Sequence, residues 1–151
     1  MKKNIILALF AIFAFLFISC EDHTHDHSDH FEPEGWVFID GTSARFIKIF
    51  RGQFLADSKQ EFTVKSGEKT DHFDIKFFDK NQKEIDPPSD TDYKLSWSIT
   101  NENLFEVDRH DGEEWEFHLE GKAVGITEIE FFVMHGDHND VRSGKIKVVV
   151  E

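Results

Sequence analysis

Four histidines stand close together near the start of the chain, in the segment 20-CEDHTHDHSDH-30. The segment holds His23, His25, His27 and His30, interspersed with Glu21, Asp22, Asp26 and Asp29. Neutral imidazole is a common ligand of zinc, copper and nickel, and carboxylates complete or orient such sites. Alternate residues of an extended segment point the same way, so several of these imidazoles could converge on one ion. The segment therefore predicts metal binding, with a solvated polar spacer as the alternative.

A second group of histidines and carboxylates lies within 135-HGDHND-140. Strongly alternating apolar segments flank it, which predicts a hairpin loop with Gly136 at the turn. His135, Asp137, His138 and Asp140 would supply two imidazoles and two carboxylates to a metal ion at that loop. The alternative is a polar turn with one capping histidine.

The other three histidines are predicted to be solvated rather than metal ligands. His118 alternates with the apolar Phe117 and Leu119, so it should face solvent. His110 lies in an acidic loop that could join a metal site, but a solvated turn is favoured there. The same interpretation applies to His72 at the start of a predicted strand.

No motif of the chain predicts an enzyme. The sequence has no phosphate-cradling glycine loop and no Gly-x-Ser-x-Gly nucleophile elbow. Residues 79–92 are rich in acids but lack the spacing of an EF-hand calcium loop. Trp36, Trp97 and Trp115 are predicted to be core residues, with an exposed carbohydrate-stacking platform as the alternative.

The first twenty residues have the pattern of an export signal. Lys2 and Lys3 give a basic start, and the apolar run from Ile5 to Ile18 is shorter than the roughly 20 residues that span a bilayer. The run ends in 17-FISC-20, which resembles the lipobox of bacterial lipoproteins. That resemblance implies cleavage before Cys20 and a covalent lipid on this cysteine. The alternative is ordinary secretion.

The charge of the chain limits its partners. It has 30 acidic and 17 basic residues, a formal net charge of −13. Such acidity argues against nucleic acid as a partner and against adsorption onto anionic lipid, and it favours attraction of cations. Cys20 is the only cysteine, so no internal disulfide can form and a hydrophobic core must supply the stability.

Residues beyond the cysteine divide into a polar tether and a β-rich part. Residues 20–34 are predicted to be a flexible tether, because they offer too little apolar surface to order themselves. From residue 35 on, short runs with a period of two alternate with turn residues, which predicts an antiparallel sandwich. The expected strands are Trp36–Asp40, Ala44–Phe50, Gln60–Lys65, Phe73–Asp79, Tyr93–Ile99, Leu104–Val107, Trp115–Leu119, Ile126–Met134 and Lys145–Val150.

Three segments, 95-LSWSITNENLFEV-107, 121-GKAVGITEIEFFV-133 and 145-KIKVVV-150, look similar to bacterial immunoglobulin-like domains. The resemblance implies an all-β, immunoglobulin-like antiparallel β-sandwich with a buried strand tryptophan, and it is nearly silent on function. The expected division is a signal peptide at 1–19, a lipidated tether at 20–34, an added N-terminal hairpin at 35–59 and the sandwich at 60–151. In such a sandwich the first strand starts at the same end as the loop joining the last two strands. An added hairpin consists of two antiparallel strands, so the chain still enters at the same end of the sandwich. The tether is therefore expected near His135 and His138.

These patterns predict a lipid-anchored protein of the bacterial cell envelope, with the outer membrane favoured, that captures or buffers a divalent transition metal. Zinc is favoured over nickel and copper, because imidazole and carboxylate suit it and no soft ligand remains. Binding should weaken below about pH 6, where histidines protonate. A metal transporter or an outer-membrane receptor is the expected partner. The alternative function is an interaction or structural module of the envelope that binds no metal.

Overall fold

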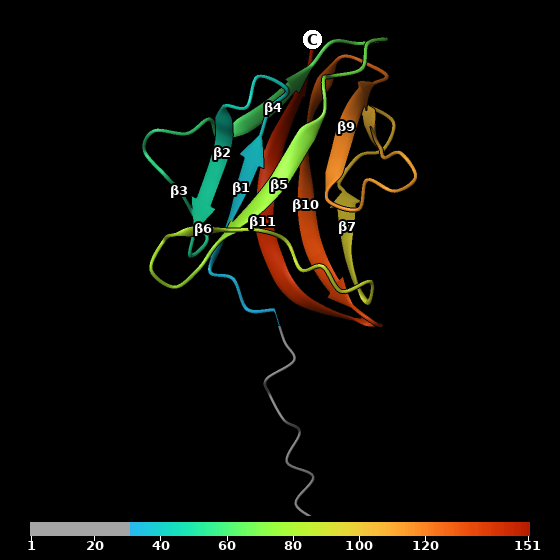
Figure 1. Cartoon of the computed structure of the whole chain (residues 1–151). Coiled ribbons are helices and arrows are strands. Elements are labelled where there is room, and N and C mark those ends of the chain that lie inside the picture. Colours follow the sequence, from blue (N-terminus) through green and yellow to red (C-terminus); the bar gives the residue numbers. More distant parts are fainter. Residues whose placement is uncertain (1–30) are drawn as a thin grey trace, which may run out of the picture.

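The computed structural model describes residues 31–151, which form two β-sheets packed face to face (Figure 1). The predictions for the signal peptide, for Cys20 and for the four tether histidines fall on residues 1–30 and lie outside the described residues. Within residues 31–151, no helix is long and apolar enough to span a membrane. The regular structure there consists of strands, as the period-two pattern predicted.

The larger sheet has seven strands in the order β3-β2-β1-β5-β9-β8, with β6 paired to β5. Its strands are β1 Gly35–Ile39, β2 Arg45–Phe50, β3 Gln53–Phe54, β5 Phe73–Phe78, β6 Glu84–Ile85, β8 Phe105–Asp108 and β9 Glu116–Gly121. All of its pairings are antiparallel. β1 and β2 form the expected N-terminal hairpin, and β1 also pairs with β5, so the hairpin widens this sheet.

The smaller sheet has four strands in the order β4-β11-β10-β7. Its strands are β4 Glu61–Val64, β7 Tyr93–Ile99, β10 Gly125–His135 and β11 His138–Val150. β4 pairs parallel to β11, while β11 with β10 and β10 with β7 are antiparallel. The long β10–β11 hairpin is the centre of this sheet.

The order of the strands is that of an immunoglobulin-like sandwich. The seven main strands from β4 onward are β4, β5, β7, β8, β9, β10 and β11, since β6 has only two residues. The second, fourth and fifth of them (β5, β8 and β9) lie in the larger sheet. The third, sixth and seventh strands (β7, β10 and β11) lie in the other, as in immunoglobulin domains. The predicted fold class, an all-β immunoglobulin-like sandwich with an added N-terminal hairpin, is confirmed.

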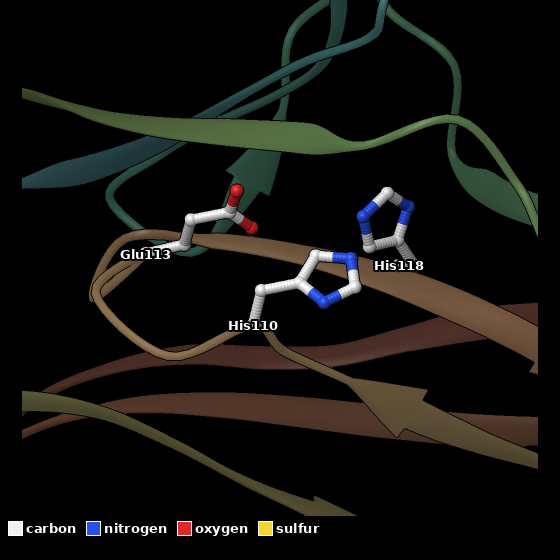
Figure 2. Close-up of side chains that lie close together, drawn as sticks. All are labelled: His110, Glu113 and His118. Atoms are coloured by element: carbon white, nitrogen blue, oxygen red, sulfur yellow. The ribbon is translucent and has the colours of Figure 1, made fainter.

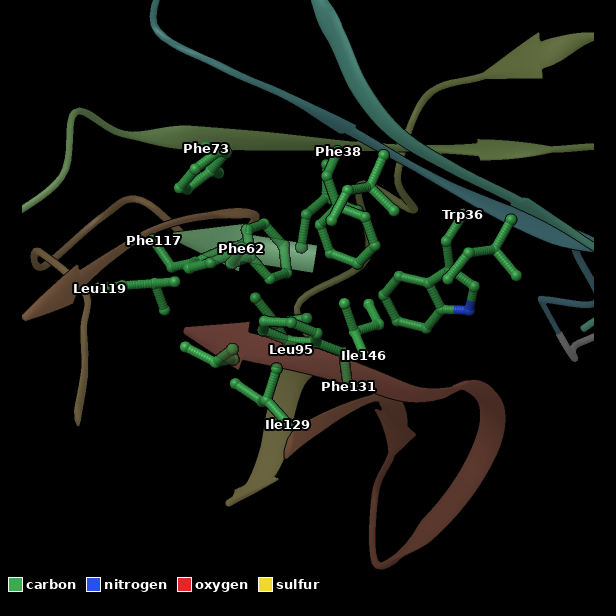
Figure 3. Packing of buried hydrophobic residues seen from close by; sticks show 14 of the residues in the cluster. Trp36, Phe38, Phe62, Phe73, Leu95, Phe117, Leu119, Ile129, Phe131 and Ile146 are labelled. Carbon is green, nitrogen blue, oxygen red and sulfur yellow. The ribbon is translucent and has the colours of Figure 1, made fainter. Parts of the chain in front are cut away.

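Phenylalanine rings make up much of the core between the two sheets (Figure 3). Because successive side chains of a strand alternate between its faces, β10 points Ile129, Phe131 and Val133 inward, each with 0% exposure. Trp36 and Phe38 of β1 stack at a ring distance of 5.8 Å and belong to the same buried cluster. The N-terminal hairpin therefore contributes to the same core as residues 60–151.

Two of the three tryptophans are less buried than the sequence predicted. Trp36 is fully buried, whereas Trp97 and Trp115 are half-buried and pack against the margin of the core. Trp97 lies on β7, the edge strand of its sheet, and the guanidinium of Arg109 lies 5.7 Å from its ring centroid. Alternation gives the face on which a side chain lies, but an edge position leaves that side chain only partly covered.

Gly121 permits a close backbone approach at the end of β9. A Cβ atom built there would lie 2.3 Å from the carbonyl oxygen of Lys65, so the backbone would have to shift. We expect Gly121→Ala to lower the free energy of unfolding by about 1–3 kcal/mol, the usual cost of overpacking. Urea denaturation checks this value. Val124→Ala, at a side chain that is 71% exposed, is the control and should stay within about 0.5 kcal/mol. Equal stabilities would contradict the close approach.

Candidate metal centre

The β10–β11 hairpin closes through a two-residue turn at one end of the sandwich. His135 at the end of β10 is paired with His138 at the start of β11. Gly136 between them has a φ of 60°, which the first central position of a type II′ turn requires and which glycine adopts without strain. The turn holds the two histidines at opposite positions of the ladder, as the sequence predicted for a hairpin loop.

A β-bulge follows the turn and positions the carboxylate. Met134 is paired with Asn139 and Val133 with Val141, so Asp140 is the extra residue of the bulge. A bulge of this kind re-aims the side chain of the extra residue. The result is that Asp140 lies against both histidines, although it comes from the opposite strand to His135.

Three of the four predicted residues converge. His135, His138 and Asp140 each offer a ligand atom, and these atoms lie within 4.8 Å of one another. An Oδ atom of Asp140 lies 3.1 Å from Nε2 of His138, and the other lies 3.6 Å from Nδ1 of His135. The side chain of Asp140 is only 5% exposed, so its charge is held in a shielded position between the two rings.

Asp137, the fourth predicted residue, lies at the tip of the turn. Its side chain is fully exposed, and its Oδ1 atom lies 3.5 Å from Nδ1 of His138. It does not belong to the group of three whose ligand atoms come together. Asp137 can add to the local negative charge, and it provides a matched comparison for Asp140 within the same loop.

Tyr93 connects the hairpin to the start of the described chain. Its ring stacks on His135 at a centroid distance of 4.3 Å and an interplanar angle of 13°. Its hydroxyl oxygen accepts a hydrogen bond of 3.1 Å from the backbone N–H of Phe31. Phe31 therefore enters the sandwich at the end that carries the hairpin (Figure 1).

An acidic cleft of about 530 Å³ opens beside Tyr93. It is lined by residues 88–94 together with Glu114 and Trp115. The carbonyl oxygen of Asp92 accepts a hydrogen bond of 3.2 Å from the N–H of Gly136, which ties this loop to the turn of the hairpin. Three carboxylates (Asp90, Asp92 and Glu114) outnumber one cation (Lys94) in its lining, which favours the attraction of cations.

A second group of potential ligands was not predicted. His110, Glu113 and His118 also bring ligand atoms within 4.8 Å of one another. His118 does point away from the core, as alternation predicted, but it is half-buried rather than solvated because residues of the 109–115 loop lie close to it. The only sequence signal was two histidines and several acids within nine residues. His72 is exposed, as predicted.

Comparison with known proteins adds little to this picture. No model of a known protein family and no curated protein sequence matches the chain. Among solved structures, domains 4 and 5 of the S-layer protein SbsC match with a TM-score of 0.41 and 17% sequence identity. The match covers 61% of this chain and 47% of that one, so the chain spans about half the length of the S-layer structure.

Proposed function

We propose that the protein binds a divalent transition metal ion, with zinc favoured, at His135, His138 and Asp140. The observation that carries this proposal is the convergence of two imidazoles and a shielded carboxylate on one bulged hairpin. Zinc bound by nitrogen and oxygen at about 2.0–2.1 Å places its ligand atoms roughly 3.3 Å apart in a tetrahedron. Small side-chain rotations would bring the three donor atoms from their present separations to that distance.

The fourth ligand would come from the tether. Three protein ligands leave one position of a tetrahedral ion open. His30 is bonded directly to Phe31, whose N–H binds the tyrosine that stacks on His135. His27 is four residues from Phe31 and so within about 14 Å of it along an extended chain. His23 and His25 would extend the capture range, passing ions from the tether to the fixed hairpin.

The donor set supports a borderline transition metal over calcium or magnesium. Calcium and magnesium take oxygen ligands almost exclusively, whereas imidazole nitrogen suits zinc, nickel and copper. The acidic cleft beside Tyr93 would raise the local concentration of cations in general. The histidines would then select the transition metal from among the cations that the charge attracts.

The setting of this activity is proposed from the N-terminal sequence. The export signal and the lipobox-like 17-FISC-20 support a lipid on Cys20 and attachment to a bacterial membrane in the cell envelope, with the outer membrane favoured. A metal transporter or an outer-membrane receptor would be the partner that takes over the ion. On this proposal the protein buffers or delivers metal, and it performs no catalysis.

Calorimetric titration of the untagged chain with Zn²⁺, Ni²⁺ and Cu²⁺ tests the proposal. We expect a Kd of about 1 µM or lower near pH 7.5 and much weaker binding near pH 5.5, because protonated imidazole cannot bind metal. Binding weaker than about 1 mM at both pH values would contradict the proposal. That outcome would leave an immunoglobulin-like interaction or structural module of the envelope as the function.

The sharing of one ion between tether and hairpin has its own test. Spectra of the Co²⁺- or Cd²⁺-loaded chain should contain one set of ligand signals, from the shared ion, that changes in both of two variants. One variant carries His135→Ala and His138→Ala, and the other replaces the four tether histidines with alanine. Ligand signals that are unaltered by the hairpin replacements would contradict the shared site and leave the tether as a separate binding segment.

A further inference from the structure

A second set of ligand atoms lies on the outer face of the larger sheet. The loop of residues 109–115 connects β8 to β9 and brings His110 and Glu113 close to His118, which projects from β9 away from the core (Figure 2). The rings of His110 and His118 are 5.1 Å apart and nearly perpendicular, at 69°. None of these residues belongs to the hairpin group, which lies on the other sheet.

The hydrogen bond of His118 prepares this ring for a metal ion. Its Nδ1 atom lies 3.0 Å from the carbonyl oxygen of Thr70. A carbonyl oxygen only accepts hydrogen bonds, so Nδ1 must carry the proton and Nε2 keeps its lone pair in the neutral ring. A backbone carbonyl that holds one imidazole N–H while the other nitrogen faces the ion is the usual outer shell of a metal-binding histidine.

Glu113 provides a second, independent sign of a cation. Its Oε2 atom is shielded from solvent and accepts no hydrogen bond from the residues that the structure describes. A shielded carboxylate oxygen without a donor is costly, and a positive ion beside it removes that cost. The carboxylate of Glu113 also supplies one oxygen to the group of converging ligand atoms that contains the two imidazoles.

The surroundings of the group are predominantly acidic. The carboxylates of Asp74 and Glu113 lie close enough to that of Glu116 to repel its charge. Of the nearby cations, Lys69 is hydrogen-bonded to Asp108. The guanidinium of Arg109 donates to the carbonyl oxygen of Leu95 and lies over Trp97. These basic groups are therefore engaged at the margin of the cluster.

We propose that His110, Glu113 and His118 form a second metal site, for one divalent transition ion, separate from the hairpin. Two imidazole nitrogens and one carboxylate oxygen suit zinc, cobalt, nickel or copper. Their donor atoms lie within 4.8 Å of one another, and an ion would draw them to the roughly 3.3 Å of tetrahedral coordination. The fourth position stays open to water.

Cobalt titration of a whole chain that lacks the hairpin and tether histidines tests this site. The chain is purified in detergent without an affinity tag, with His23, His25, His27, His30, His135 and His138 replaced by alanine. We expect one Co²⁺ per chain with visible absorption. Changing an outer-shell partner typically weakens metal binding about 10- to 100-fold, so loss of a ligand through Glu113→Gln or His110→Ala should weaken it at least about 100-fold.

His72→Ala is the matched control, because it removes the only other histidine left in that chain. The ring of His72 lies 6.3 Å from that of His118 but outside the group of three. We expect its replacement to change cobalt affinity less than about threefold, far below the loss expected for a ligand. Folding of each variant is checked by circular dichroism.

Two results would overturn the second site. One is the absence of cobalt binding in the folded variant whose six hairpin and tether histidines are replaced by alanine. The other is cobalt binding by that variant that His110→Ala leaves unchanged. Should that variant not fold, the same question is put to the unmodified chain, in which His110→Ala should lower the number of bound Co²⁺ ions by one. An unchanged number there would also overturn the proposal. These results leave the hairpin site untouched, because its own ligands are tested separately.

Discussion

Replacing Asp140 with asparagine should weaken zinc binding at the hairpin at least about 100-fold while the fold is retained. Asparagine keeps the size and shape of the side chain but removes the negative charge that lies between His135 and His138. Outer-shell changes alone typically weaken metal binding about 10- to 100-fold, so losing a charged ligand should exceed that range. The affinity is measured by competition against a zinc indicator. The chain used carries alanine at the other proposed histidine ligands, which are His23, His25, His27, His30, His110 and His118.

Asp137→Asn is the matched control in the same loop. Its carboxylate is fully exposed and lies outside the converging group, so its attraction to His138, 3.5 Å away, is screened by solvent and salt. We expect less than about a threefold change in zinc affinity. Equal losses for the two variants would mean that the general acidity of the loop, and not the geometry of Asp140, determines binding.

Replacing Phe131 with alanine should strongly destabilise the core. Phe131 has 0% exposure, and its ring centroid lies 4.7 Å from that of Phe117 and 5.2 Å from that of Phe38. It thereby joins rings of the larger sheet to the smaller sheet. Burial of this kind predicts a loss of about 3–5 kcal/mol in the free energy of unfolding, measured by urea denaturation.

Ile126→Ala on the same strand is the control for Phe131→Ala. Ile126 is 67% exposed, so its truncation should change stability by less than about 0.5 kcal/mol. A loss below about 1 kcal/mol for Phe131→Ala would contradict a single close-packed core between the two sheets.

The strands and their faces could be predicted because the signal is local. Ile129 stands between Glu128 and Glu130, and the period of two that starts there places Ile129, Phe131 and Val133 on the buried side of the strand. The two-residue strands β3 and β6 are too short to show a period. The parallel pairing of β4 with β11 joins segments that are far apart in the sequence, and no local pattern reports it.

The candidate sites differ in predictability for the same physical reason. The hairpin group was visible because His135, His138 and Asp140 lie within six residues and a tight turn must bring them together. The sequence pattern did not predict the β-bulge, which brings Asp140 and not Asp137 between the two histidines. The second group was missed because alternation places His118 on the outer face correctly but cannot tell that the 109–115 loop brings His110 and Glu113 to it.

Long-range ¹H–¹⁵N spectra of the histidine rings during zinc titration test the central claim most directly, because each imidazole reports separately. The account predicts that ring nitrogen signals of His135 and His138 change with the first equivalent of zinc and that the exposed His72 does not respond. Zinc binding that leaves the rings of His135 and His138 unchanged, or no zinc binding at all, would contradict the hairpin as a metal centre.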